Sequence, residues 1–472
     1  MSITRTPMTS VDRAWLRMDS PENPMMICGV LALDRQISIN RLKHTIEQRL
    51  LCFDRFRQRV IDKGERAYWQ EDPLFHIDNH LHQIALPGHA GKTELQTLVS
   101  DLNSSALDFR RPLWQMHYID NYESGSAVLL RVHHCIADGI SLVRVMLSLA
   151  DTTPEPRLRR SASRKTPAPS AGSGLQKTLH RAVDSALMAA EQTRLFLSEI
   201  RKEPNYPMKL ASAAGGIATD LLKLGLAPFE PATGLRQPLS GRKQVAWAEP
   251  LDLAEVKACA KVLGGTINDV LMSTVTCALQ RHFKARKEPI PECGLRVAVP
   301  FNLRPLDQPI QTLGNKFGLV IVPLPVEIQD PIMCFNQVRE NMNRLKHSYQ
   351  AQVTYSLLDL FGRGPDILER RALDLLSNKA SAVLTNVPGP KEPLYFAGGK
   401  ITQPMFWVPQ SGTIGIGLSV FSYAGTVQFG VTLDKNIHAD PDEVIAHFQE
   451  SFKALSHAAL AGREGLINRQ AG

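Results

Sequence analysis

The sequence predicts an α/β protein built from two domains of similar size. Strand-like and helix-like segments alternate in both halves of the chain, a pattern typical of α/β folds. A stretch rich in proline, serine and arginine, 151–174, separates the halves. The 472 residues suffice for two large cores, and 43% hydrophobic against 21% charged residues is an ordinary globular mix. We therefore expect domains at 1–150 and 241–472, with 151–240 as a linker and crossover helices.

The first half contains alternating helix and strand candidates. Apolar residues at helical spacing define the helices, and Thr9 and Ser10 are plausible caps for the first. Apolar and aromatic runs bounded by turn residues, such as 122–125, define the strands. The expected helices are 11–16, 39–51, 95–102 and 140–147, and the expected strands are 25–33, 67–70, 115–120 and 127–132.

The second half continues the alternation with clearer helix starts. Thr266 and Asp269 stand at capping-box spacing, and Pro331 and Pro441 each follow an aspartate at a first helical position. The expected helices are 251–263 and those beginning near 267, 331 and 441, and the expected strands are 244–248, 295–300, 319–326, 380–385, 413–421 and 426–433. Between the halves, apolar stripes predict helices at 175–203 and 208–226, either as packed crossovers or as a face for a membrane surface.

The segment His-His-Cys-Ile-Ala-Asp-Gly, 133–139, offers the most specific chemistry. Because side chains alternate along a strand, His134 falls on the all-apolar face of the preceding strand and His133 falls on the other. The two rings would then not chelate one metal together. Burial disfavours a charged imidazole, so His134 is expected to be a neutral base. The alternative is a purely structural segment in which Asp138 caps the following helix.

Composition narrows the function classes. A net charge of +8 suits nucleic acid, an anionic membrane surface or a phosphorylated small molecule, but no nucleic-acid motif occurs, so we expect no such partner. Seven scattered cysteines without a Cys-x-x-Cys pair argue against a disulfide framework or zinc ribbon, favour a reducing compartment, and leave no metal expected. We expect neither a secretory signal nor a membrane-spanning helix, because no apolar stretch has the required form.

Three apparent motifs lack the features that their chemistry requires. The stretch 88–93 has no glycine where a Walker A motif needs one, and 412–417 has the glycine order of a dinucleotide fingerprint reversed. No Gly-x-Ser-x-Gly elbow supports a serine nucleophile. Cys135 follows His134, but nothing in the sequence predicts a low thiol pKa, so an apolar packing role is expected for it.

His-His-x-x-x-Asp-Gly after a strand resembles the signature of the CoA-dependent acyltransferase superfamily, which includes chloramphenicol acetyltransferase and peptide-synthetase condensation domains. Three further segments, 112–114, 266–270 and 386–395, are similar in order and spacing to those of bacterial wax ester synthase/acyl-CoA:diacylglycerol acyltransferases. The resemblance covers nearly the whole chain. It departs at 24–26, where the family often has a histidine after Pro-Met, and at Thr385, where serine is usual.

The resemblance implies two chloramphenicol-acetyltransferase-like domains, each a mixed sheet with flanking helices, with an active-site tunnel between them. It implies acyl-CoA as donor, diacylglycerol or a long-chain alcohol as acceptor, and no cofactor beyond the acyl-CoA substrate. It also implies a cytoplasmic protein that associates peripherally with the inner face of the plasma membrane or with lipid inclusions.

Matching by residue, His134 corresponds to the catalytic base, and His133, Asp138 and Gly139 to its structural neighbours. Asn268 matches a second-domain residue that faces the site, where it would contact the oxyanion or the acceptor; its alternative is ordinary helix-start chemistry. The segments that carry the resemblance supply the expected substrate-binding residues, which are Pro112, Leu113, Trp114, Asp269, Asn386, Pro388 and Gly389. For Asp269 a capping role is the stronger expectation, and Arg304 is a candidate partner for the Asp138 carboxylate.

The expected activity is O-acyl transfer that makes triacylglycerol or wax esters. A neutral histidine removes the proton of the attacking hydroxyl, and CoA thiolate leaves readily, so no acyl-enzyme is needed. Two alternatives remain from the sequence. One is a carrier-protein-dependent or polyketide-ester acyltransferase of the same superfamily, and the other is a non-catalytic protein that binds lipid surfaces. The sequence does not choose the acceptor, the chain length or the oligomeric state.

Overall fold

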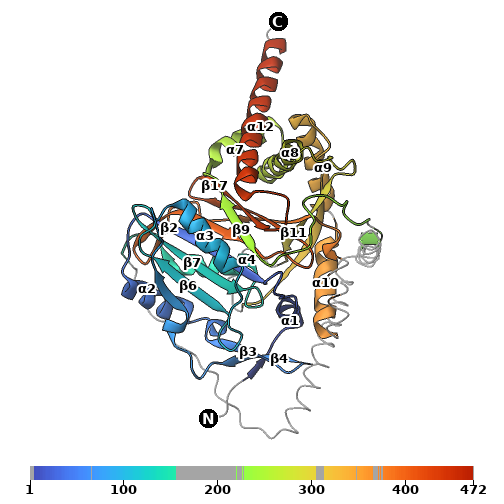
Figure 1. Cartoon of the computed structure of the whole chain (residues 1–472). Coiled ribbons are helices and arrows are strands. Elements are labelled where there is room, and N and C mark those ends of the chain that lie inside the picture. The colour runs from blue at the N-terminus through green and yellow to red at the C-terminus, as the bar shows by residue number, and fades with distance from the viewer. Residues whose placement is uncertain are drawn as a thin grey trace, which may run out of the picture. The chain divides into compact units, whose positions relative to one another are not determined.

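The structure is a computed structural model, in which helices and strands alternate along the chain (Figure 1). The predicted linker and the helices expected at 175–203 and 208–226 lie almost entirely outside the described residues. All other elements belong to one unit, Met1–Pro156 with Ala227–Gly472. The structure describes residues 5–64, 66–155, 219–220, 226, 228–303, 313–346, 348–364, 370, 373 and 376–470.

The first large sheet has seven strands in the order β5-β6-β7-β2-β15-β14-β8. Its centre is β2, which pairs antiparallel with both β7 and β15. Helices α2 (Ile39–Thr45), α3 (Lys92–Asn103) and α4 (Gly139–Leu149) come from the same half of the chain. The strands are β2 (Met26–Leu33), β5 (Leu81–Ile84), β6 (Trp114–Ile119), β7 (Ser126–His133), β8 (Ala150–Asp151), β14 (Tyr395–Phe396) and β15 (Gly399–Trp407).

The second large sheet is mixed, in the order β10-β17-β16-β13-β11-β12, with β9 also paired to β17. Strand β13 runs parallel to both of its neighbours, and the other pairs are antiparallel. The strands are β9 (Lys243–Trp247), β10 (Leu251–Asp252), β11 (Leu295–Asn302), β12 (Phe317–Leu324), β13 (Ala382–Pro388), β16 (Ile416–Tyr423) and β17 (Thr426–Asp434). The mixed α/β class is confirmed.

Helices cover the second sheet on one face (Figure 1). Their buried side chains form one core with the strands, where for example Phe429 of β17 stacks on Phe448 at 3.8 Å between ring centroids. The covering helices are α7 (Leu253–Val262), α8 (Ile267–Arg286), α9 (Pro331–Lys346) and α12 (Pro441–Gln470). Two further helices, α1 (Ser10–Arg17) and α10 (Gln350–Arg363), pack together through Gly362, where a Cβ would collide with the Ser10 carbonyl.

The second half of the chain contributes strands to the first sheet. Strand β15 adds to β2 with Trp407 opposite Cys28, and β14 pairs with β8. The segment 241–472 therefore forms the second sheet by itself and also supplies β14 and β15 to the first sheet. No strand was expected at β15 from the sequence, because Pro404 interrupts its apolar pattern and proline usually marks an edge or a break.

Two smaller features also differ from the sequence-based expectations. The helix expected at 39–51 is α-helical only to Thr45, and Ile46–Leu50 continues as a π-helical turn. A small third sheet, in the order β1-β4-β3, forms beside the first. Its strands are β1 (Arg5–Pro7), β3 (Gln58–Asp62) and β4 (Ala67–Glu71).

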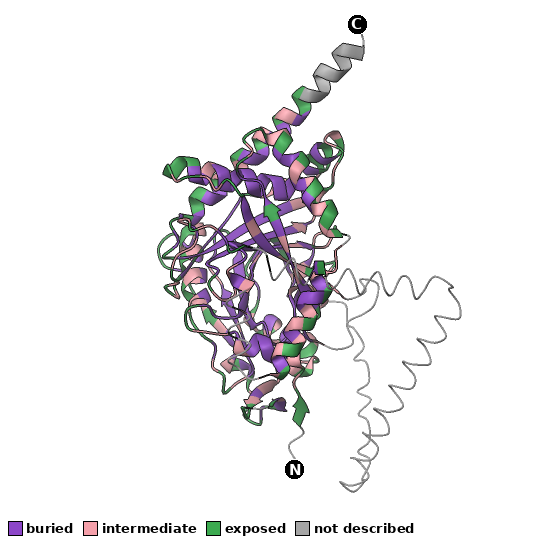
Figure 2. Cartoon of the chain, turned by 90° about the vertical axis from the view of Figure 1, so that its right-hand side faces the viewer, coloured by how far each residue is buried: buried purple, intermediate pink, exposed green. Residues whose placement is uncertain are grey.

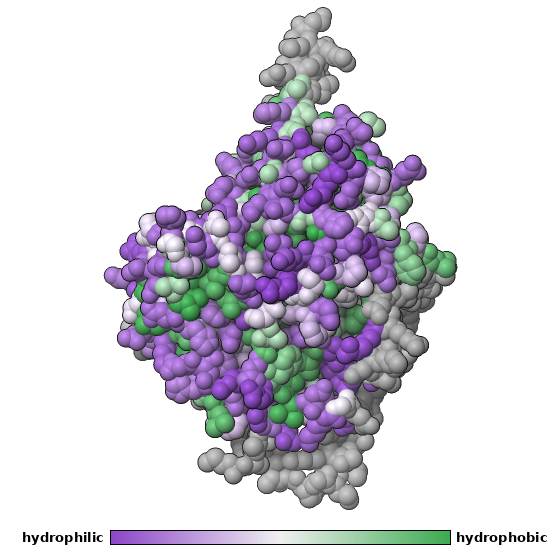
Figure 3. All heavy atoms as spheres, viewed as in Figure 1, coloured by the Kyte–Doolittle hydropathy of each residue, from purple (hydrophilic) through white to green (hydrophobic). Residues whose placement is uncertain are grey.

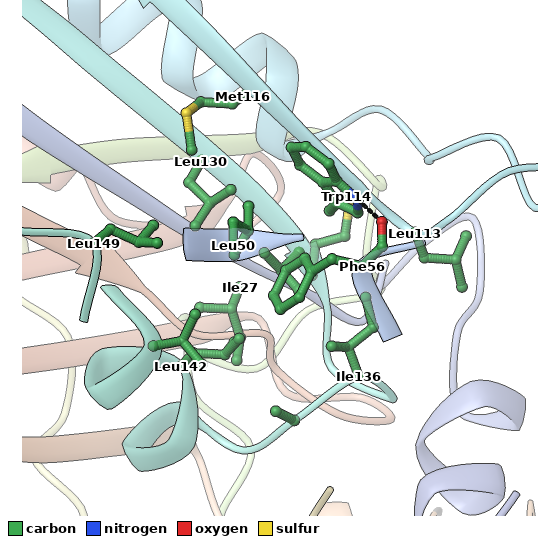
Figure 4. Packing of buried hydrophobic residues seen from close by; sticks show 14 of the residues in the cluster. Ile27, Leu50, Phe56, Leu113, Trp114, Met116, Leu130, Ile136, Leu142 and Leu149 are labelled. Atoms are coloured by element: carbon green, nitrogen blue, oxygen red, sulfur yellow. Dashed lines mark hydrogen bonds between the residues drawn. The ribbon is translucent and has the colours of Figure 1, made fainter. Parts of the chain in front are cut away.

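Buried residues concentrate on the strands and on the inner faces of the helices (Figure 2). In the first core, Trp114 packs among aliphatic side chains and donates its indole N–H to the Phe56 carbonyl at 2.8 Å (Figure 4). His80 stacks on the same indole with 4.6 Å between ring centroids. The indole N–H of Trp114 is thus hydrogen-bonded, and its rings are packed against other side chains.

Within the described residues, no single helix combines the length and apolarity of a membrane span. The pair α7 and α8 passes that test only jointly, and the two helices are bent by 95° with respect to each other.

Replacing Trp114 with alanine should lower the free energy of unfolding by about 3–5 kcal/mol, because a fully buried aromatic side chain is lost. Trp114→Phe should cost less, because only the indole hydrogen bond and part of the ring disappear. Urea denaturation measures both changes. Leu74→Ala is the control, since Leu74 is 78% exposed and should change stability by less than about 0.5 kcal/mol.

Candidate active site

The two histidines of the motif occupy different surroundings at the end of β7. His133 is the last residue of the strand, and His134 follows it with its backbone N–H donated to Met25 at 2.7 Å. The His133 ring lies against Asp19, whereas the His134 ring stacks on Trp15 with 4.1 Å between centroids. The two rings thus have separate neighbours, as strand parity led us to expect.

His133 has a structural environment. Its Nδ1 accepts the backbone N–H of Cys135 at 3.1 Å, so its proton lies on Nε2, which donates to Asp19 Oδ2 at 3.2 Å. The same carboxylate oxygen accepts the Met25 N–H at 2.8 Å. The Asp19 carboxylate therefore joins the end of α1 to the start of β2 and to the motif.

His134 is held between two aromatic rings and is almost completely buried. Trp15 stacks on one side, and the Phe317 ring centroid lies 5.6 Å away at a tilt of 45°. Burial is the main cause that lowers the His134 pKa from 6.5 to about 4, and the negative charge of Asp138 partly opposes it. The imidazole is therefore neutral at pH 7, which is the form that accepts a proton.

Asp138 caps α4 and also bridges to the second half of the chain. Its Oδ1 accepts the Ser141 N–H at 2.8 Å, and its Oδ2 accepts the Lys316 N–H at 3.0 Å, just before β12. Its role as the helix cap explains why the chain turns immediately after the motif. Arg304, which was a candidate partner for this carboxylate, lies outside the described residues.

A chamber lined by His134 shares wall residues with two others. This His134 chamber also includes Trp15, Asp138, Gly139 and Asn386 in its walls. At Gly139 a Cβ would meet no other atom within 4 Å, so the glycine leaves the chamber open beside the base.

The second space, the apolar chamber, shares Gly139 and Phe406 with the His134 chamber. About 870 Å³ there is not filled by protein atoms, part of it open to solvent. The β7 face that carries Val128, Leu130 and Val132 forms one wall. This is the face to which strand parity assigned His134.

The third space, the asparagine chamber, shares Asn386 and Val387 with the His134 chamber and also contains Asn268, Pro388 and Gly389. Asn386 Nδ2 donates to Asn268 Oδ1 at 2.8 Å. That bond leaves the Asn268 N–H groups as donors toward the chamber.

The other expected substrate-binding residues lie away from these chambers. Trp114 and Leu113 are fully buried in the first core, and neither they nor Pro112 line the three chambers described above. Asp269 closes the capping box of α8, with its Oδ2 accepting the Thr266 N–H at 2.8 Å. Their assignment to substrate stays a prediction.

Sequence reasoning did not single out Trp15, Phe317 or Asn315, although all three surround His134. Trp15 belongs to a short predicted helix 119 residues before the motif, and Phe317 begins a strand whose expected start was later. The motif itself contains no signal for such distant neighbours. Among the described residues, no three histidine, cysteine or acidic side chains gather as metal ligands.

Comparison with known proteins identifies the family. The description "Wax ester synthase/diacylglycerol acyltransferase catalytic domain" matches residues 8–271, and the corresponding C-terminal domain matches 313–456. The chain belongs to the wax ester synthase/diacylglycerol acyltransferase family. It is an acyltransferase.

Relatives of this family member match it along their full length. A Mycobacterium tuberculosis protein named "Probable diacyglycerol O-acyltransferase" is 25% identical, with 98% of each chain covered. A second protein of that species is 28% identical over 96% of this chain and 99% of its own.

The family member also shares its fold with solved structures. The wax ester synthase/diacylglycerol acyltransferase from Marinobacter aquaeolei VT8 aligns with a TM-score of 0.68 at 18% identity, covering 96% of this chain and 99% of its own. The first condensation domain of the calcium-dependent antibiotic synthetase aligns with a TM-score of 0.60 at 17% identity, covering 97% and 96%. The expected two-domain acyltransferase fold is confirmed.

The rate of acyl transfer should fall on the acid side only as pH approaches about 4. The sequence predicts His134 as the base, a base accepts a proton only when neutral, and burial keeps His134 neutral down to that pH, well below the 6.5 of an exposed histidine. The pH dependence of kcat/KM measures this directly. An acid limb centred near 6.5 would show that the His134 ring is solvated in the working enzyme.

Proposed function

We propose that this acyltransferase moves a long-chain acyl group from acyl-CoA to the hydroxyl of diacylglycerol or of a long-chain alcohol, with His134 as the general base. The observation that carries the proposal is the buried, neutral His134 ring in the wall of a chamber that adjoins an apolar chamber and shares Gly139 and Phe406 with it. A long-chain molecule with a hydroxyl group suits these two chambers, because its hydroxyl can lie beside His134 and its hydrocarbon chain can pack against the apolar walls.

In this mechanism His134 takes the hydroxyl proton while the oxygen attacks the thioester carbonyl. The tetrahedral intermediate collapses with loss of CoA thiolate, which receives the proton from His134. No acyl-enzyme forms, and no cofactor or metal takes part. The Asn268 N–H groups, oriented by Asn386, are candidate donors to the oxyanion or to the acceptor. Such preorganised donors are worth roughly 3 kcal/mol each.

Diacylglycerol is the first acceptor to test, because full-length relatives carry a diacylglycerol acyltransferase name. The Marinobacter protein carries both activities in its title, which keeps long-chain alcohols in the panel. Likeness to condensation domains concerns the fold alone and supports no carrier-protein substrate.

We also propose that the enzyme works at the cytoplasmic face of the plasma membrane or on lipid inclusions, where its acceptor resides. A net charge of +8 suits an anionic surface. Apolar residues lie in patches among hydrophilic ones on the face shown in Figure 3. Large exposed apolar side chains include Leu74, Phe229, Phe301, Met333 and Leu360. Flotation with anionic and neutral liposomes tests this proposal.

His134→Ala should reduce the release of free CoA from palmitoyl-CoA with dioleoylglycerol or hexadecanol by about 10²–10⁴-fold, the range that a positioned base contributes. The matched control is His89→Ala, at a position outside the three chambers. An unchanged rate in His134→Ala would refute the base assignment. Turnover with acyl-carrier protein and none with acyl-CoA would instead favour a carrier-dependent enzyme. Liposome binding without release of CoA would favour a non-catalytic protein.

Gly29→Val should lower kcat/KM for long chains more than for short ones. Gly29 lines the apolar chamber, and its Cβ position meets nothing closer than the Met405 carbonyl at 3.6 Å, so a larger side chain would enter the space. Varying acyl-CoA length and acceptor length separately shows which chain the chamber holds. Gly91→Ala, at the start of α3, is the control and should keep the wild-type length profile.

A further inference from the structure

Asn315 connects the catalytic histidine to a fully buried carboxylate. It lies two residues before β12, in the second half of the chain, and its side chain donates two hydrogen bonds into the first half. Its Nδ2 donates to the backbone carbonyl of His134 at 2.8 Å and to Asp12 Oδ1 at 2.9 Å. Asn315 does not line the His134 chamber, so it has no access to substrate there.

These two bonds determine which way the amide faces. The Nδ2 group has two oxygen acceptors, whereas a flipped amide would place its oxygen against a carboxylate and a carbonyl. The Asn315 backbone N–H also donates to Asp12 Oδ1, at 2.9 Å. The amide oxygen, Oδ1, therefore points away from Asp12 and from the His134 carbonyl.

The buried Nδ1 of His134 is the polar atom that this arrangement leaves to be satisfied. Neither His134 Nδ1 nor Asn315 Oδ1 has a hydrogen bond of normal geometry within the described structure. The carbonyl of His134 itself and the Asn315 side chain both favour the charged imidazole and so raise its pKa. Both are acceptors, so they favour a proton on Nδ1. Catalytic hydrogen bonds that are long without substrate commonly shorten in the complex.

Asp12 is held from the other side by Arg55. The Arg55 guanidinium donates to Asp12 Oδ2 at 2.8 Å and to the Ile136 carbonyl at 2.7 Å. The carbonyls of His134 and Ile136 are thus both fixed by groups that meet at one carboxylate. Removing the charge of Asp12 would leave the half-buried Arg55 guanidinium without its ionic partner, and such losses are costly.

We propose that Asn315, anchored by Asp12, is a positioning residue that keeps the proton of the neutral His134 on Nδ1 and so presents Nε2 to the substrate hydroxyl. The inference rests on the proposed role of His134 as base. It adds that one tautomer is selected, and that the second half of the chain selects it. Without the anchor the preference for a proton on Nδ1 is weaker, and the fraction with its proton on Nε2 cannot act as the base.

The test compares kcat/KM across pH for the wild type, Asn315→Ala and Asn315→Asp. Asn315→Ala should lower the rate in proportion to the fraction of His134 that carries its proton on Nε2, about twofold if the two tautomers become equal, and move the acid limb to lower pH, because a group that favours the charged ring is lost. Asn315→Asp removes the Nδ2 donor and sets a second carboxylate against Asp12, so it should lower the rate at least as much. A lowered rate in both variants, with the acid limb of Asn315→Ala at lower pH than that of the wild type, is the expected signature.

Asn23→Ala is the matched control. Asn23 is also a buried asparagine that joins the halves, with Nδ2 donating to the Gly412 and Ile414 carbonyls and Oδ1 accepting from Lys243. Its loss should lower stability and leave the acid limb in place. Asp12→Asn, which keeps the shape of the side chain, replaces Asn315→Ala if the latter does not fold, and it should also lower the rate.

A second measurement reads the tautomer directly. In protein labelled with ¹⁵N-histidine, the resonances that disappear in His134→Gln belong to His134. They should report a proton on Nδ1 in the wild type and a mixture in Asn315→Ala. Wild-type rates and coincident acid limbs in the Asn315 variants, or an unchanged tautomer, would overturn the inference while leaving the His134 assignment intact. Loss of His134 without effect on the rate would overturn both.

Discussion

Removing the His134 imidazole from water is the constraint around which the site is arranged. Stacking on Trp15 and contact with Phe317 keep the ring dry, and the resulting pKa near 4 leaves it neutral. A dry ring needs partners for its polar neighbours, since an unpaired buried group costs about 1–3 kcal/mol. The Asn315 amide and the Arg55 guanidinium meet that need by donating hydrogen bonds to the carbonyls of His134 and Ile136. The packing that excludes water from the His134 ring and the hydrogen bonds that hold the motif therefore depend on each other.

The walls of the site come from both halves of the chain and form three chambers that share wall residues. α4 and β7 supply Gly139 and the apolar face of β7, while β13 supplies Asn386 and its neighbours. Strand β15 brings Phe406 to the edge shared by two chambers, because it adds directly to β2. An apolar chain and a hydroxyl can thus approach one histidine from adjoining spaces without sharing a single pocket.

Local patterns predicted much of the fold and one side of the site. Alternation along β7 separated the surroundings of His133 from those of His134, and the capping box at Thr266 marked the start of α8 correctly. Long-range pairing was not predictable in this way. Strand β15 carries a proline, and its partner lies near the other end of the chain, so neither periodicity nor turn residues indicated it.

The residues around His134 were missed for a related reason. Trp15, Asp12 and Asn315 read as ordinary helix and loop residues, and their role depends on packing between segments far apart in sequence. The phosphate-loop-like stretch ending at Thr93 is a case in which neighbouring residues alone explain the sequence pattern. Glu94 accepts the Gly91 N–H and so caps the start of α3.

The pairing of β15 with β2 also bears on how the chain reaches its folded state. Leu33 of β2 pairs with Ile401 of β15, so almost the whole chain must be synthesised before the second edge of β2 finds its partner. Until then that edge is an exposed template for unwanted pairing. Contacts of such long sequence separation slow folding, and slow folders of this size commonly populate intermediates. During synthesis the nascent first half would therefore depend on chaperones to protect β2, and a truncated product ending before residue 399 would be prone to aggregate.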